Sequence, residues 1–197
     1  MHIDNPAFWR AGAISTVAIM SAVLIMLTID SLAAISPGGS NVPRYMVINQ
    51  HIDYKFDDKR GNDVPVIGGP EPLFGKTVDA AAAEALIDKG KMVIQSRSCI
   101  DCHTFFGNGA YYAPDLTKAW LDPAWETWKI ITGTKTREDA MVQFLMHPDK
   151  YRIWTRAMPN LDITQQEAEA LVAYLKWMSA VDTNGFPANF GRMQQKQ

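Results

Sequence analysis

The chain has 197 residues, of which 47% are hydrophobic and 20% are charged, and its formal net charge is −2 at pH 7. This composition is typical of a folded globular protein and excludes intrinsic disorder and fibrous repeats. The balanced charge provides no basic face for nucleic acid, and two cysteines are too few for a disulfide framework or a four-cysteine zinc site.

The first predicted element is an apolar helix near the N-terminus. Residues 11–29 contain no charged side chain, and at about 1.5 Å per residue they extend roughly 28 Å, close to the hydrocarbon thickness of a bilayer. The small residues at 31–34 resemble a signal-peptide cleavage site, but the apolar region of a signal peptide is usually about 7–15 residues long. We therefore predict a retained membrane anchor at residues 1–30, spanning about 9–30.

Residues 31–76 are rich in proline and glycine, which indicates an extended linker. Polar and apolar residues alternate from His51 to Phe56, which predicts a short strand that returns in a hairpin through Val64–Ile67. Beyond the linker we expect one domain at residues 77–187 and a C-terminal tail at 188–197.

The domain at 77–187 is predicted to be mainly helical. Helix signals occur at four places: 77–95 with Asp79 in its first turn, after Asp122-Pro123, from Thr136, and 164–181 with a Thr164/Glu167 capping box. Gly90 would allow the first and last of these helices to cross closely, against Tyr174 or Trp177. The resulting fold class is mainly α, with one N-terminal transmembrane helix joined to the helical domain through a short extended segment.

The strongest motif is Cys99-Ile100-Asp101-Cys102-His103, the C-x-x-C-H signature of c-type haem attachment. Thiols at this spacing can form thioether bonds to the two vinyl groups of one porphyrin, and His103 then becomes the proximal iron ligand. A thioredoxin-like dithiol would need a preceding βαβ unit, and a zinc site would need two more ligands, whereas the other three histidines are scattered. We predict one haem c bound covalently to Cys99 and Cys102, so the helical domain is predicted to be a cytochrome c domain of class I type.

The sixth iron ligand must come from the chain downstream. The candidates are Met141, Met146, Met158, Met178, Met193 and His147. Methionines on predicted helices are more often core residues, whereas Met158 stands in a loop before Pro159, so we predict Met158, with His147 as the alternative. Pro114, eleven residues after His103, either offers its carbonyl oxygen to the histidine ring or is an ordinary loop proline.

Histidine–methionine ligation fills both axial positions of the iron, so the domain is predicted to transfer electrons and to hold no catalytic centre. Haem is attached covalently outside the bacterial cytoplasm, which places the domain in the periplasm and the N-terminus in the cytoplasm. Arg10, at the start of the apolar stretch, agrees with that orientation in the inner membrane.

Two stretches resemble one family. The haem motif followed by Gly-Asn-Gly-Ala-Tyr-Tyr-Ala-Pro-Asp-Leu at 107–116 is similar to the haem segment of the small cytochrome c subunit of bacterial nitric oxide reductase. Arg156-Ala157-Met158-Pro159, Leu175-Lys176-Trp177 and residues 182–187 resemble its C-terminal region. The single N-terminal span also matches, whereas residues 31–76 are longer than this family leads us to expect.

The resemblance implies a subunit that receives electrons from a small periplasmic cytochrome c or cupredoxin and passes them to a large haem b-containing membrane subunit, which reduces two NO to N2O. It also implies that the loop at 107–113 faces that subunit, where the backbone carbonyls of Gly109 and Tyr111 hold a calcium ion and Tyr112 packs near the haem. Two alternatives remain: the equivalent subunit of a related oxygen-reducing haem–copper-type oxidase, and a free membrane-tethered electron shuttle.

Overall fold

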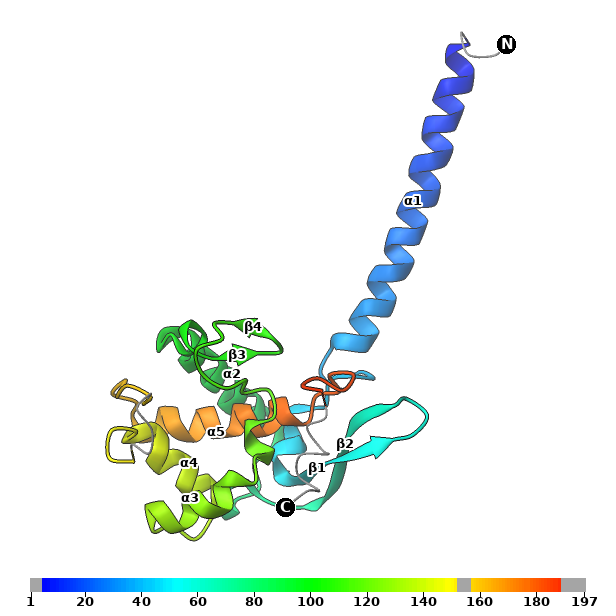
Figure 1. The fold of residues 1–197 in the computed structure, drawn as a ribbon. Helices are drawn as coiled ribbons and strands as arrows, with labels where there is room; N and C mark the ends of the chain where they lie inside the picture. The colour runs from blue at the N-terminus through cyan, green and yellow to red at the C-terminus, as the bar shows by residue number, and fades with distance from the viewer. Residues whose placement is uncertain (1–4, 152–156, 189–197) are drawn as a thin grey trace. The chain divides into compact units, whose positions relative to one another are not determined.

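The computed structural model of the protein describes residues 5–151 and 157–188. The chain is mainly helical and divides between Val42 and Pro43 into two compact units (Figure 1). The extended segment predicted at 31–76 therefore contributes to both units.

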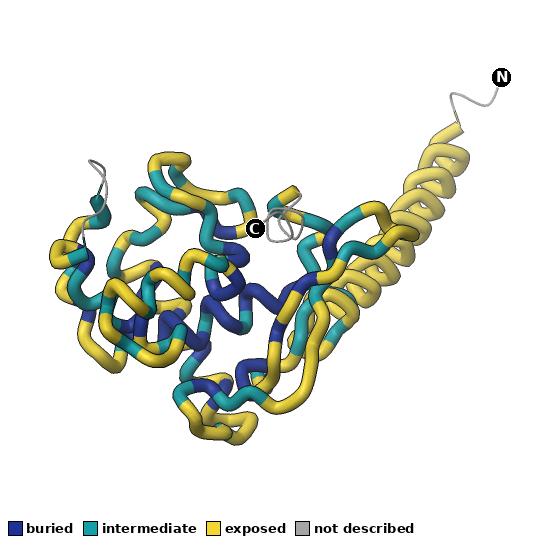
Figure 2. The backbone as a smooth tube through the Cα atoms, turned by 60° about the horizontal axis from the view of Figure 1, so that its bottom comes forward, coloured by how far each residue is buried: buried dark blue, intermediate teal, exposed yellow. Residues whose placement is uncertain are grey.

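The first unit is dominated by α1, Pro6–Ile35, a helix of 30 residues. Asn5 caps its N-terminus by accepting a hydrogen bond from the backbone N–H of Ala7, and the helix ends where Ser36 N–H donates to Leu32 O. The helix is longer than the apolar stretch from which it was predicted. None of its residues is buried and nearly all are exposed (Figure 2), and it is long enough and apolar enough to cross a membrane.

The second unit begins with the short 3₁₀ helix η2, Tyr45–Asn49, and the hairpin of β1, Gln50–Asp57, and β2, Asn62–Pro70. The strands are antiparallel, with Ile52 opposite Ile67, which confirms the hairpin predicted from the alternating pattern. Ile52 and Tyr54 are buried in the same hydrophobic core as the helices that follow. The hairpin is therefore an integral part of the folded unit rather than a flexible connection.

Two helices form the centre of this unit: α2, Ala80–Ser96, and α5, Gln165–Ser179. A β-carbon at Gly90 would collide with the carbonyl oxygen of Ala170 and lie 2.7 Å from the β-carbon of Tyr174, which confirms that the glycine permits a close crossing. Helix α2 begins at Ala80, three residues later than predicted. The reason is that the Asp79 carboxylate accepts a hydrogen bond from Ala82 N–H at 2.8 Å and so acts as the N-cap.

The remaining helices are α3, Ala124–Thr132, and α4, Arg137–Met146. The second was predicted to start around Thr136, which is its N-cap. The capping box between Thr164 and Glu167 at the start of α5 is also present. Short elements complete the unit: the 3₁₀ helices η3, Leu73–Gly75, η4, Cys99–Asp101, and η5, Ala119–Leu121, and a two-stranded pairing of β3, Thr104–Phe105, with β4, Asn108–Gly109.

A buried lysine caps the C-terminal end of α5. The Nζ atom of Lys118 donates hydrogen bonds to the carbonyl oxygens of Ser179, at 3.2 Å, and Val181, at 2.9 Å. It also lies 4.4 Å from the ring centroid of Tyr54, whose hydroxyl donates to the same Val181 oxygen. Burial lowers the pKa of Lys118 to about 7, although the carboxylates of Asp182 and Asp115 oppose the change.

This lysine should make stability depend on pH. Because its pKa is lower in the folded chain than in the unfolded chain, the unfolded state binds more protons above pH 7, and stability rises with pH. From pH 7.5 to 8.5 we expect a gain of roughly 1 kcal/mol, or about 2–4 °C in the unfolding midpoint of the full-length protein in detergent. Lys118→Met should lose this rise, whereas Lys91→Met, at an exposed position of α2, should keep it. Equal pH dependence in the parent chain and Lys118→Met would contradict this assignment.

Candidate haem-binding site

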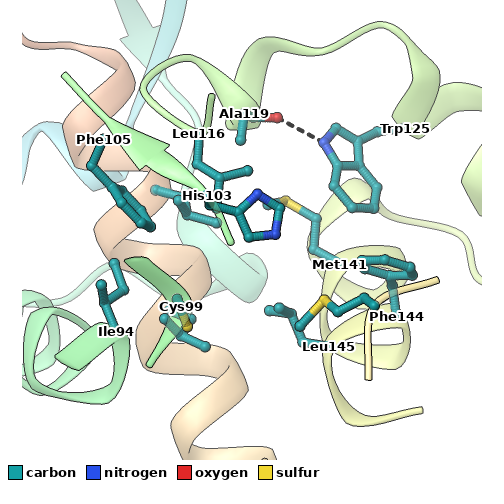
Figure 3. Close-up of a pocket in the computed structure, with 13 residues that line it drawn as sticks. Ile94, Cys99, His103, Phe105, Leu116, Ala119, Trp125, Met141, Phe144 and Leu145 are labelled. Atoms are coloured by element: carbon teal, nitrogen blue, oxygen red, sulfur yellow. Dashed lines mark hydrogen bonds between the residues drawn. The ribbon is translucent and has the colours of Figure 1, made fainter. Parts of the chain in front are cut away.

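A cavity lies beside the C-x-x-C-H motif (Figure 3). Its lining side chains are Ile94, Cys99, His103, Phe105, Leu116, Ala119, Trp125, Met141, Phe144, Leu145, Met158, Leu171 and Leu175. They come from α2, the haem motif, β3, η5, α3, α4, α5 and the connecting loops, so the cavity forms only when these segments pack together. Apart from the histidine, the lining is apolar, aromatic or sulfur-containing, which suits a flat apolar macrocycle.

The imidazole of His103 extends into this cavity (Figure 3). Its Nδ1 atom is 2.8 Å from the carbonyl oxygen of Pro114, the contact considered from the spacing. Because a carbonyl only accepts, Nδ1 must donate, which leaves the lone pair of Nε2 available to a metal. Burial lowers the pKa of His103, which favours the neutral imidazole that binds metal ions.

The two cysteines of the motif are free thiols. Cys99 lines the cavity, whereas Cys102 is half-buried and is not among the lining residues. Burial raises the pKa of the Cys99 thiol, which is the opposite of the lowered pKa that a reactive redox dithiol requires. The raised pKa of Cys99 therefore gives no support to thioredoxin-like chemistry.

The candidates for a second axial ligand are separated by their positions. Met158 is half-buried and lines the cavity from the segment before α5. Met141, on α4, also lines it, but is 1% exposed and belongs to the hydrophobic core. Met146, His147 and Met178 are not among the lining residues, and Met193 lies outside the described residues. Within the described residues, Met158 and Met141 are therefore the candidates that line the cavity, and the second of these was set aside from helical spacing alone.

Aromatic residues of α3 and α4 form one wall that the sequence analysis missed. Trp125 is held by a hydrogen bond from its indole nitrogen to Ala119 O at 2.7 Å, and its ring centroid is 6.2 Å from that of Phe144. Trp128 contacts the same phenylalanine at 4.8 Å between centroids. The sequence does contain a signal for this wall, because Trp125 and Trp128 are three residues apart and therefore lie on one face of a helix.

The glycine-rich loop after the motif lies on the surface. Tyr111 is 85% exposed and Tyr112 is 58% exposed, and neither lines the cavity. Gly109 has a φ of +127°, and a β-carbon there would collide with the carbonyl oxygen of His103. Glycine is therefore required at 109 for close approach to the backbone of the histidine. Within residues 5–151 and 157–188, no group of three or more His, Cys, Asp or Glu could hold a metal ion.

Comparison with known proteins agrees with this geometry. The sequence profile of the cytochrome c family matches residues 87–179. The C subunit of nitric oxide reductase from Stutzerimonas stutzeri is 32% identical over 114 residues, which cover 58% of this chain and 72% of that protein. The chain belongs to the family of nitric oxide reductase C subunits. The C subunit from Paracoccus denitrificans is 32% identical over 127 residues, which cover 58% of this chain and 73% of that protein. The C subunit from Cereibacter sphaeroides is 26% identical over 113 residues, which cover 57% of this chain and 72% of that protein.

Membership of this family makes the chain a subunit of a redox complex, and its cytochrome c domain implies covalently bound haem c. The apolar cavity is consistent with that group. It places the neutral ring of His103, the thiol of Cys99 and the thioethers of two methionines around one apolar space.

Proposed function

We propose that this chain is the electron-entry subunit of nitric oxide reductase. It accepts electrons from a small periplasmic cytochrome c or cupredoxin and passes them to the haem b catalytic subunit, which converts two NO to N2O. The main support is the cavity, because His103 and Met158 both line it and can fill both axial positions of one haem iron. With both positions filled by this chain, the iron would have no site for substrate and would act as an electron carrier.

The residues that would hold the haem are Cys99 and Cys102 through thioether bonds, and His103 and Met158 through the iron. The bound haem supplies a one-electron couple between ferrous and ferric iron. The chain's own contribution is to hold the proximal imidazole through Pro114 O and to exclude water with an apolar lining.

The same proposal includes the location of the chain. Helix α1 serves as a single-pass anchor in the bacterial inner membrane, surrounded by lipid, because none of its side chains is buried by protein. The haem domain lies in the periplasm, where haem is attached, and the N-terminus lies in the cytoplasm, with Arg10 on the inner side.

The catalytic subunit is proposed to dock on the surface formed by Phe106, Tyr111, Tyr112 and Phe186. These four side chains are between 37% and 85% exposed, and exposed aromatic residues are enriched at protein interfaces. Phe186 lies against the loop, because its ring would be 3.5 Å from a β-carbon at Gly107. The backbone carbonyls of Gly109 and Tyr111 would contribute two oxygens to an interfacial calcium ion, with further ligands from the partner.

Removal of calcium should weaken this interface. Treatment of the purified complex of both subunits with a calcium chelator is expected to cause a large loss of co-migration in size-exclusion chromatography, and re-addition of calcium should restore it. The visible spectrum of haem c should not change, because the loop lies outside the cavity. A complex that contains no calcium by metal analysis would contradict the proposal. Substitution of Gly109 is unsuitable as a test, because it would displace the backbone of His103.

The proposed function can be tested by following electrons through the complex. The purified complex is reduced anaerobically and mixed with NO in a stopped-flow spectrophotometer while N2O is measured. Haem c should become oxidised as N2O forms. Oxidation by O2 but not by NO, together with copper instead of non-haem iron in the complex, would favour the related oxygen-reducing enzyme. Purification of the chain without any haem b subunit would favour a free shuttle.

A further inference from the structure

The segment that contains His103 is joined residue by residue to the segment that contains Pro114. The ring of His103 contacts Pro114 O at 2.8 Å, and the hydroxyl of the next residue, Thr104, donates to Asp115 Oδ2 at 2.7 Å. The backbone N–H of Leu116 then donates to Thr104 O at 2.9 Å. The histidine contact is thus the first of three consecutive contacts between the two segments.

Asp115 is the centre of this arrangement. Its Oδ1 atom accepts a hydrogen bond from Thr117 N–H at 2.8 Å, and its Oδ2 atom accepts a second, longer bond from Gly107 N–H at 3.4 Å. One carboxylate therefore joins three points of the loop, and hydrogen bonds to an ionised carboxylate are stronger than neutral ones. Thr104 is only 2% exposed, and its hydroxyl donates to this carboxylate. Removal of the carboxylate would therefore take that hydrogen bond away from a buried hydroxyl.

Pro114 cannot hold its own position. It is exposed, so little packing fixes it, and a proline has no backbone N–H with which to anchor itself. Its carbonyl is placed by the residues on either side: Ala113, whose N–H donates to Cys102 O at 2.8 Å, and Asp115. The geometry of the His103–Pro114 contact therefore depends on the Thr104–Asp115 hydrogen bond.

We propose that Asp115, acting through Thr104 and Pro114, is a positioning residue that fixes the orientation of the His103 ring and lowers the reduction potential of the haem. The inference rests on the proposed haem site. A histidine that donates Nδ1–H to a well-placed carbonyl is a more basic ligand, which stabilises ferric iron. The carboxylate of Asp115 is hydrogen-bonded to Thr104, the neighbour of His103, and its negative charge near the iron acts in the same direction.

Three variants of the full-length chain test this role. Asp115→Asn removes the charge and weakens the Thr104 contact, Thr104→Val removes the hydroxyl at nearly constant shape, and Thr104→Ser keeps the hydroxyl. Redox titration should give a higher potential for Thr104→Val than for the parent and a still higher one for Asp115→Asn, whereas Thr104→Ser should match the parent. The ferric electron paramagnetic resonance spectrum, which reports on axial ring orientation, should shift in the first two variants alone.

A purely structural role for Asp115 gives a different result. Thr104→Val and Asp115→Asn would then lower the midpoint of thermal unfolding but leave the potential and the paramagnetic resonance spectrum unchanged, which would overturn the positioning role and leave the proposed function intact. Absence of covalent haem from the parent chain would instead overturn the proposed function and this role together. Thr104→Val is the milder change and keeps the test available if Asp115→Asn does not fold.

Discussion

Replacement of both Cys99 and Cys102 with serine is expected to abolish covalent haem binding completely. The two thiols are the only cysteines in the chain, and a hydroxyl does not form the thioether to a vinyl group. The full-length parent chain should stain for haem peroxidase activity on a denaturing gel and retain its haem in acidified acetone. The double variant should show neither property.

The single variants and a control make this result specific. Cys99→Ser and Cys102→Ser each leave one thiol, so each should give weak staining from one remaining thioether. Ser96→Ala, at an exposed position at the end of α2, should stain like the parent. Complete extraction of haem from the parent by acidified acetone would contradict covalent attachment, and equal staining of the double variant would exclude these cysteines as the attachment points.

Elements determined by neighbouring residues could be predicted from the sequence. The capping box at Thr164 and Glu167 and the hairpin that starts near His51 follow from short-range patterns, and both are present. The start of α2 was placed three residues early, because both Thr77 and Asp79 are good capping residues. Only the observed hydrogen bond from Ala82 to Asp79 distinguishes them.

Features that depend on contacts distant in the sequence could not be predicted. Tyr54 and Val181 are 127 residues apart, so nothing local indicated that the hairpin joins the helical core. Lys118 and Lys176 have 2% and 0% exposure, although lysine is seldom fully buried. In the cavity, the contact between His103 and Pro114 was one of two alternatives that the spacing left open, and the structure shows it. The position of Met141 could not be predicted, because the sequence does not reveal which core methionine borders a cavity.

Removal of the thioether at Met158 should change the haem more than any other single substitution outside the C-x-x-C-H motif. Met158→Leu keeps an apolar side chain of similar volume but removes the sulfur ligand. The haem should stay covalently bound but lose the absorption band of thioether-ligated ferric haem. Its reduction potential should fall by tenths of a volt, within the ~0.8 V range that axial ligands cover. Met158→His should remain low-spin, also with a lower potential, because imidazole replaces a thioether.

Met141→Leu is the matched control, because this methionine borders the same cavity from a buried position on α4. It should retain the spectrum and potential of the parent, at a cost of less than about 1.5 kcal/mol in stability, as expected for a volume-conserving change in a core. The opposite pattern, an unchanged Met158→Leu and an altered Met141→Leu, would make Met141 the ligand. If neither substitution alters the spectrum, the same measurement on His147→Ala should identify the imidazole as the sixth ligand. The three variants therefore assign the axial position by spectroscopy and potential, independently of any partner subunit.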